Sequence, residues 1–599
     1  MDAPVPGGDA ATPPPRPRGN ELLDHVKTLL RVLSHGRRRG RLLALSGGVV
    51  VVICANAAGQ IRLNDWQGAF YDALGQRDLP AFLTQLGVFV LIIAVLLSLT
   101  VAQTWLQEMV KISLRETLTG DLLDQWLRPK RAYRLAFAGE IGINPDQRVQ
   151  EDARHLCELT AELSIGLLQS SLLLVSFVGV LWVLSSQVVF MTAETSFTIP
   201  GYMVWCALVY ALIGSALTRI VGRPLIRLNA ERYAREADFR FALVRLNESA
   251  EGVALYGGEG DERRLLGAAL DRVLRVMLQL AAGLARLTWV TSGYGWLALV
   301  APVIVASPGY FMGTMTLGGL MMVVGAFYQV QQALRWYVDN FPRIADWRAT
   351  LLRVMSFRDA LQAVEGLGAE AGRITLGEHP AGRLAMRDFG VLLAEGRASL
   401  DEPEVEIGPG ERVLILGGPG SGKSTMFLAL AGLWPWGTGT VLMPPAAEMA
   451  FLQQRPYMPL DTLRAALAYP QDPKALTDEA AQTALRRVGL GQLASRLDSV
   501  ERWDKELTFD EQQRLAAARL LLRRPRWIVM DEGLTGLSDE SLALVCDILR
   551  TELAEAAIID FARSAPVDGF FTRTLHLRQL PGGHVLTLRP EAAAPAASA

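Results

Sequence analysis

Long stretches without a charged side chain mark the first half of the chain. They cover residues 42–61, 79–107, 163–193, 195–218 and 287–334. A helix needs about 20 mainly apolar residues to cross a bilayer, so each of the first four stretches predicts one membrane span. The fifth is long enough for two spans, with a turn predicted at Ser307-Pro308-Gly309-Tyr310. The pattern predicts six spans and disfavours a soluble helical core, whose helices would carry a charged face.

Basic residues gather on one side of the predicted spans. They are frequent before the first span, between the second and third, and between the fourth and fifth. The opposite connections hold only Arg62 and Arg77 in the first, and no Lys or Arg over 187–200 and 307–313. Loops rich in Lys and Arg stay in the cytoplasm, so we expect the amino terminus and everything after the sixth span to be cytoplasmic.

The connection between the fourth and fifth spans is itself helix-like. Residues 231–259 alternate charged and apolar positions near the helical period. This pattern predicts that the spans extend into the cytoplasm as stalks with a crosswise helix at the tip. A solvated amphipathic loop is the alternative that the sequence leaves open.

Composition changes after residue 346. Residues 346–380 are expected to be a linker, and residues 381–590 alternate short β-type and helical segments, which predicts an α/β domain. Residues 1–20 and 591–599 resemble loose tails. The net charge of −2 gives no overall attraction to nucleic acid. The four cysteines form neither a CxxC pair nor a zinc-type cluster.

The strongest chemical motif lies between an apolar segment at 412–416 and a predicted helix at 426–433. It matches G-x-x-x-x-G-K-[ST] and comprises Gly417, Gly418, Pro419, Gly420, Ser421, Gly422, Lys423, Ser424 and the flanking Thr425. Backbone N–H groups of such a loop wrap phosphate oxygens, and the helix N-terminus adds partial positive charge. We expect ATP here, with Lys423 reaching the β- and γ-phosphates and the Ser424 hydroxyl on Mg²⁺.

A second apolar segment, 527–530, ends in Asp531 and Glu532. Asp531 is expected to hold Mg²⁺, directly or through water, and Glu532 to orient or deprotonate the attacking water. Taken alone, Asp531 and Glu532 could equally be two acidic residues that end a solvated strand and have no catalytic role. The phosphate loop favours the catalytic interpretation.

With these motifs the second half resembles the ATP-binding domains of the ABC transporter family. Gln454 matches the family's Q-loop glutamine, which contacts Mg²⁺ and faces the membrane domain. Residues 507–514 (LTFDEQQR) occupy the signature position, where relatives typically have L-S-x-G-E/Q-x-Q-R. The resemblance implies that Thr508 and Glu511 complete the ATP site of a second nucleotide domain. One chain holds one such domain, so it implies a half-transporter that works with a second half.

Further short motifs narrow the resemblance to SbmA/BacA-like and peroxisomal (subfamily D) half-transporters. They are LNDW at 63–66, FYDAL at 70–74, NPDQR at 144–148, LNESAE at 246–251 and AGLWP at 431–435. The implied fold is an all-α six-helix membrane domain of the ABC exporter type over 21–345, followed by an α/β P-loop nucleotide-binding domain. The implied cargo is a hydrophobic or amphipathic solute such as an acyl lipid, cobalamin or a peptide. We expect the bacterial inner membrane as its location.

Three positions depart from the family pattern. Asp510 replaces the signature glycine, Ala562 stands at the switch histidine, and Ser538 replaces the D-loop acid. Two like unit charges about 5 Å apart cost roughly 3 kcal/mol at an effective dielectric near 20, so we expect Asp510 to repel the partner's γ-phosphate. A homodimer should therefore bind Mg-ATP and hydrolyse it slowly. Two alternatives remain: a degenerate subunit of a heterodimer, and an ATP-binding permease or regulator with little hydrolysis.

Overall fold

The computed structural model describes residues 19–35, 39–135, 144–186, 188, 190–192, 195–197, 199–363, 372–393, 396–565 and 569–580. The tails expected at 1–20 and 591–599 lie outside these ranges, except for residues 19 and 20. The chain divides into two compact units: residues 1–124 with 144–356, and residues 125–143 with 357–599. The connection 125–143, assigned by sequence to the membrane domain, thus groups with the second unit.

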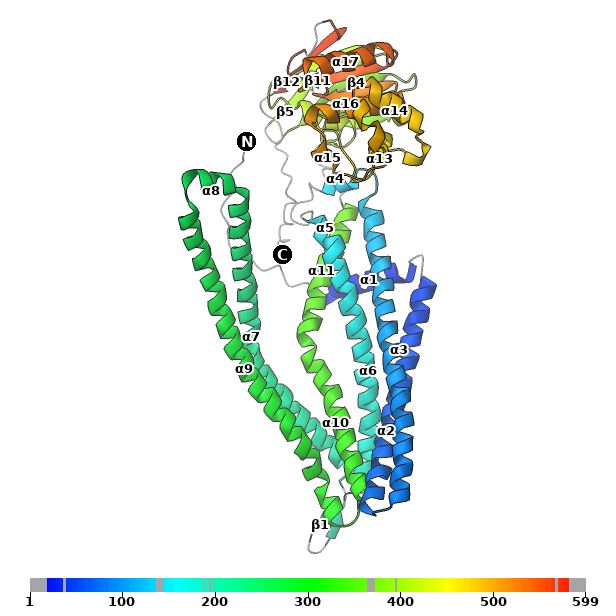
Figure 1. Cartoon of the computed structure of the whole chain (residues 1–599), viewed down its shortest axis with the longest axis vertical. Helices are drawn as coiled ribbons and strands as arrows, with labels where there is room; N and C mark the ends of the chain where they lie inside the picture. The colour runs from blue at the N-terminus through cyan, green and yellow to red at the C-terminus, as the bar shows by residue number, and fades with distance from the viewer. Residues whose placement is uncertain are drawn as a thin grey trace, which may run out of the picture. The chain divides into compact units, whose positions relative to one another are not determined.

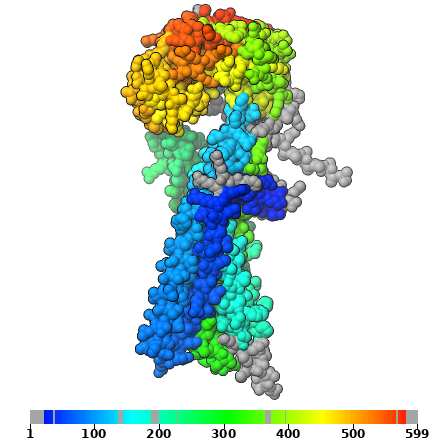
Figure 2. All heavy atoms as spheres, turned by 90° about the vertical axis from the view of Figure 1, so that its right-hand side faces the viewer, coloured from blue at the N-terminus to red at the C-terminus, as the bar shows by residue number. Residues whose placement is uncertain are grey.

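The first unit is helical (Figure 1). Its helices are α1 (Gly19–His35), α2 (Arg39–Gly75), α3 (Leu79–Trp126), α5 (Pro145–Gln147), α6 (Ala153–Ser185), α7 (Tyr202–Glu248), α8 (Ala250–Tyr256), α9 (Glu259–Phe311), α10 (Leu317–Asp339) and α11 (Phe341–Ala363). A π-helical turn, η2 (Arg148–Asp152), joins α5 to α6, and β1 (Phe190–Thr192) pairs with β2 (Thr195–Phe197). In Figure 2, α1 runs crosswise to the long α2 and α3.

Five helical segments of the described residues are long and apolar enough to cross a membrane: α2, α3, the continuous run Pro145–Ser185, α7 and α9. They coincide with the first five predicted spans. The sixth predicted span corresponds to α10, which is shorter than the five candidates and includes Gln329, Gln331 and Gln332. That α10 crosses the membrane stays a prediction.

The predicted turn at Ser307–Tyr310 is misplaced. Helix α9 continues through Pro308 to Phe311, and the chain turns over residues 312–316, where Gly313 has φ +74°. Met312 N donates to Pro308 O at 3.1 Å, so the helix still has a regular bond after the proline. Proline inside a membrane helix is tolerated because neighbouring groups satisfy the freed carbonyl, which is why the Pro-Gly pair misled the prediction.

Helices α7 and α9 pack against each other along their length, and α8 lies across their shared tip (Figure 1). Tyr210 of α7 and Tyr294 of α9 hold the two helices together, because each hydroxyl donates to the other residue's carbonyl oxygen at 2.6 Å. The expectation of helical stalks with a short crosswise helix is therefore confirmed, and the amphipathic-loop alternative is wrong.

The second unit is built on a curled sheet. Its strands are β3 (Thr375–Glu378), β4 (Leu384–Leu392), β5 (Arg397–Leu400), β6 (Glu404–Ile407), β7 (Arg412–Leu416), β8 (Gly437–Met443), β9 (Met449–Leu452), β10 (Trp527–Asp531), β11 (Ala557–Ala562) and β12 (Arg573–Leu580). The order is β3-β8-β4-β5-β12-β7-β11-β10-β9, and β6 pairs with β4. Strands β12, β7, β11, β10 and β9 are parallel. The predicted α/β fold is confirmed.

The helices of this unit are α4 (Arg131–Leu135), α12 (Lys423–Leu430), α13 (Leu463–Ala468), α14 (Asp478–Arg487), α15 (Trp503–Glu506), α16 (Phe509–Arg523) and α17 (Asp539–Thr551). Helix α4 comes from the connection 125–143. Arg134 Nη2 donates to Gly432 O at 3.3 Å, which ties α4 to the loop that follows α12.

Strands β7, β10 and β11 are mainly apolar and buried, as strands covered on both faces must be. Phe427 of α12 is fully buried against the sheet, with its ring edge-on to Phe451 and Phe561. This contact fixes α12 on the strands, and so fixes the loop that precedes α12.

We predict that Phe427→Ala destabilises the second unit by about 3–5 kcal/mol, because it removes a buried ring and leaves a cavity. Thermal unfolding of the purified chain in detergent measures the effect. Leu460→Ala is the control, since Leu460 is 73% exposed and should change the unfolding temperature little. Equal shifts for the two variants would contradict this role of Phe427.

Candidate functional site

The phosphate loop connects β7 to α12, as the motif predicts. Gly420 and Gly422 have φ +75° and +93°, a left-handed conformation that glycine adopts without strain. Lys423 is the first residue of α12, and its Nζ donates to the carbonyl oxygens of Gly417 at 2.8 Å and Gly418 at 3.0 Å. Burial lowers the pKa of Lys423. The ammonium group therefore lies inside its own loop, where an anion would replace the two carbonyl groups as its partner.

Asp531 ends β10 beside the start of α12. A hydrogen bond joins its side chain to Ser424, and burial raises the pKa of Asp531. Its Oδ1 is buried and has no hydrogen-bond partner among the described residues. A hydroxyl and a carboxylate with an unused oxygen suit Mg²⁺, which prefers oxygen ligands and keeps phosphate oxygens and waters as the others. The predicted pair Ser424 and Asp531 thus fits the ion.

Glu532 stands at the centre of the site. Its φ of +51° is unusual for a residue other than glycine, and such strain persists where the surrounding structure fixes the backbone. Its carboxylate accepts from Gln454 Nε2 at 3.1 Å and from Arg563 Nε at 3.0 Å, one bond to each oxygen. Its backbone N–H donates to Phe561 O at 2.9 Å. Each carboxylate oxygen therefore already accepts one hydrogen bond.

Gln454 follows β9, and Gln513 of α16 donates to its carbonyl oxygen at 2.5 Å. The chain therefore brings together the residues expected to act on the triphosphate, although they come from three separate segments, the start of α12, the end of β9 and the end of β10. They are Lys423, Ser424, Gln454, Asp531 and Glu532.

Sequence reasoning missed two members of this cluster. Arg563 directly follows β11, and Asp560 lies within that strand with its carboxyl group fully buried. Gly533 N donates weakly to Asp560 Oδ1 at 3.4 Å, and burial raises the pKa of Asp560 to about 7. A charged residue in an otherwise apolar central strand was the available signal for Asp560, and a basic residue at a strand end was the signal for Arg563.

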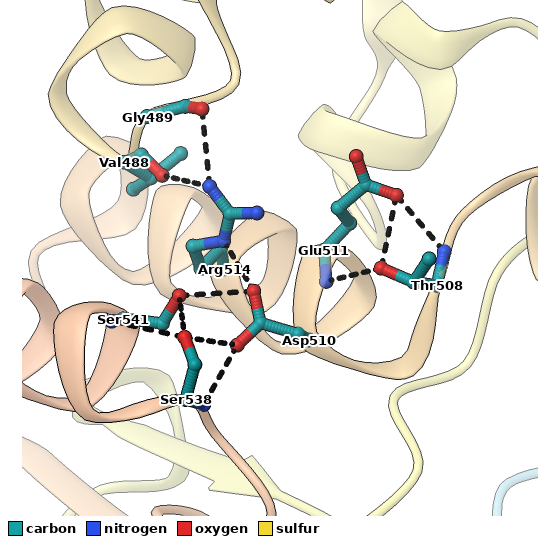
Figure 3. A network of polar contacts seen from close by, with 8 residues as sticks. All are labelled: Val488, Gly489, Thr508, Asp510, Glu511, Arg514, Ser538 and Ser541. Carbon is teal, nitrogen blue, oxygen red and sulfur yellow. Dashed lines mark hydrogen bonds and ion pairs between the residues drawn. The ribbon is translucent and has the colours of Figure 1, made fainter.

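The signature segment forms the start of α16. Thr508 is the N-cap of this helix: Glu511 N donates to Thr508 Oγ1 at 3.3 Å, and Glu511 Oε2 accepts from Thr508 N at 2.9 Å (Figure 3). This reciprocal capping box stabilises the helix start. The two residues expected to complete a second ATP site are thus paired with each other in the single chain.

Asp510 does not present a free charge, contrary to our expectation. Its Oδ1 accepts from Ser538 N at 3.0 Å, and its Oδ2 accepts from Ser541 Oγ at 2.9 Å and Arg514 Nε at 2.9 Å (Figure 3). Burial raises the pKa of Asp510, but these hydrogen bonds and the Arg514 charge outweigh it and leave the pKa below the ordinary value. The carboxylate joins α16 to the N-terminus of α17, so the expected repulsion of phosphate is largely compensated.

We predict that Asp510→Ala lowers stability by about 1–3 kcal/mol, because Arg514 Nε, Ser538 N and Ser541 Oγ lose the carboxylate to which they donate. The pKa of Asp510 is lower in the folded chain than in the unfolded chain. Its contribution to the free energy of unfolding is therefore complete above the unfolded pKa of about 3.9, and it is lost as the pH falls through the folded pKa. Unfolding measured at several pH values should show that the variant is less stable than wild type by a constant free energy above about pH 3.9. This difference in free energy should shrink as the pH falls further. Asp504→Ala, which breaks only the exposed pair with Arg502 at 3.0 Å, is the control. A pH-independent difference would contradict the assignment.

Family models match both halves of the chain. The model described as ABC transporter transmembrane region 2 matches residues 29–311, and the model described as ABC transporter matches residues 400–535. The second match includes the phosphate loop, Gln454, Asp531 and Glu532.

The relatives are similar over most of their length. The chain is 30% identical to the inner membrane ABC transporter ATP-binding protein YddA of Escherichia coli K12, over 85% of this chain and 90% of that protein. It is 27% identical to the chloroplastic ABC transporter D family member 2 of Arabidopsis thaliana, over 80% and 75%. It is 25% identical to the human lysosomal cobalamin transporter ABCD4, over 79% and 81%.

A solved bacterial Atm1-family ABC exporter with ATP bound shares the fold, with a TM-score of 0.62 over 87% of this chain and 91% of that one, at 15% identity. The predicted architecture, a helical membrane region fused to one α/β nucleotide domain, is therefore confirmed. Proteins built this way use ATP to move a solute across a membrane. The chain belongs to the ABC transporter family, as a half-transporter of the subfamily D type.

Proposed function

We propose that two copies of this chain form a transporter that binds Mg-ATP at two shared sites and moves a hydrophobic or amphipathic solute. The observation that carries the proposal is that the residues expected to form an ATP site belong to two different contact networks of the chain. Lys423, Asp531 and Glu532 gather at the sheet edge, whereas Thr508 and Glu511 are hydrogen-bonded to each other at the start of α16. A second chain would supply the missing half to each site.

In such a site Lys423 binds the β- and γ-phosphates, and Ser424 and Asp531 hold Mg²⁺, which would neutralise phosphate charge. Water attacks the γ-phosphorus while the bond from that phosphorus to the bridging oxygen breaks, and ADP leaves. Glu532 orients the water and accepts its proton. Positioning and charge neutralisation account for most of the rate in this kind of transfer.

The solute class is supported by the relatives and by the membrane helices. One relative is described as a cobalamin transporter. Uncharged amide pairs join neighbouring helices: Gln103 Nε2 donates to Gln169 Oε1 at 2.8 Å, and Gln329 Nε2 donates to Gln60 Oε1 at 3.3 Å. Uncharged polar groups of this kind are compatible with an amphipathic cargo. We place the chain in the bacterial inner membrane with its ATP-binding domain in the cytoplasm, because the basic connections lie on that side.

We predict slow hydrolysis, mainly because Ala562 lacks the imidazole of the switch histidine. In purified chain in nanodiscs, Lys423→Ala should weaken ATP binding at least about tenfold. Glu532→Gln should keep binding and lower turnover about 10²-fold or more. Ala562→His should raise turnover, and adding Asp510→Gly should bring little further gain, since the Asp510 charge is already compensated.

ATPase turnover and vanadate trapping measure these effects. Brisk wild-type hydrolysis that Ala562→His leaves unchanged would contradict the prediction. Trapping only in preparations that retain a different subunit from the native membrane would favour the heterodimer. Absence of trapping in every preparation would favour a regulator that only binds ATP.

A further inference from the structure

Arg563 occupies the position next to the missing histidine. Ala562 is the last residue of β11 and is paired in register with Leu416, the last residue of β7. Gly417 N donates to Ala562 O at 3.2 Å, so the end of β11 lies against the first residue of the phosphate loop. Arg563 therefore leaves the sheet beside the place where the triphosphate is expected.

The guanidinium group is placed to move. Its side chain is 65% exposed, whereas the side chain of its partner Glu532 is 12% exposed. The bond to Glu532 uses Nε–H, and a guanidinium carries four more N–H donors. Its bond to Glu532, the residue after Asp531 at the end of β10, places Arg563 beside the expected magnesium and phosphate site.

We infer that Arg563 senses the terminal phosphate of ATP in place of the histidine, by moving from Glu532 to the γ-phosphate. This inference rests on the proposed function. A terminal phosphate carries more charge than a carboxylate and accepts two parallel N–H bonds from an arginine, so it competes well for the guanidinium. Arginines that contact the γ-phosphate have large effects on phosphoryl transfer in other nucleotide hydrolases.

The same movement of Arg563 controls whether Glu532 can act as the general base. Gln454 donates to one oxygen of Glu532, and the Arg563 guanidinium pairs with the other and stabilises the charge, which makes the carboxylate a weaker base for water. Binding of ATP draws Arg563 away and frees Oε1 of Glu532. ADP has no γ-phosphate, so it leaves Arg563 on Glu532. One arginine thereby distinguishes ATP from ADP and releases the base only when substrate is present.

The test compares ATP and ADP affinities of the full-length chain in nanodiscs with Mg²⁺. A Glu532→Gln background prevents turnover, and a fluorescent nucleotide displaced by ATP or ADP reports each affinity. Adding Arg563→Ala should weaken ATP binding about tenfold or more, as expected for the loss of a hydrogen bond to a charged group, and should change ADP binding less than about twofold. Arg563→Lys should be intermediate. Ala562→His added to Arg563→Ala should restore part of the ATP preference.

Arg383→Ala is the matched control. Arg383 is a surface arginine of the same unit, paired with the exposed Glu406 at 3.0 Å, and its loss should change neither affinity. Equal changes for ATP and ADP, or none, would overturn the inference even if Arg563→Ala slowed hydrolysis, because Arg563 would then only orient Glu532. Failure of the proposed function appears differently: nucleotide affinity that is the same with and without Lys423→Ala.

Discussion

The parallel register of β7, β11, β10 and β9 is the constraint on which the site depends. Their carboxyl ends meet at one edge because Leu416 pairs with Ala562, Asp531 with Phe561, and Met530 with Leu452. Each strand therefore delivers its following residues to the same place. The inner strands carry apolar side chains that are buried on both faces, which keeps them in the interior of the sheet.

Charge balance at this edge explains the resting arrangement of the side chains. Two cations, Lys423 and Arg563, lie among the carboxylates of Asp531 and Glu532, and the buried Asp560 has its pKa raised to about 7 by burial. Lys423 uses loop carbonyl oxygens and Arg563 uses Glu532 as temporary partners. Both partners are weaker ligands for a cation than a triphosphate is, so a bound triphosphate can replace them.

Sequence reasoning predicted the parts of the fold that follow from local patterns. Uncharged runs predicted the spans. The glycine pattern of the phosphate loop predicted the position of Lys423, because the backbone conformation of such a loop requires glycine. It misplaced the turn near Pro308, since the local signal of Pro-Gly ignores what neighbouring helices tolerate. It also treated Asp510 as a free charge, because the partners Ser538 and Ser541 lie on another helix. The role of Arg563 beside Glu532 arises from strand pairing and has no local pattern.

The central claim is that ATP joins two copies of this chain and moves Arg563 onto its terminal phosphate. Electron cryomicroscopy of the Glu532→Gln chain in nanodiscs with ATP and Mg²⁺ tests it most directly. We predict two chains with a nucleotide between Lys423 of one and Thr508 of the other, and the Arg563 guanidinium on the γ-phosphate. A single chain, or a bound ATP with Arg563 still beside residue 532, would contradict this account.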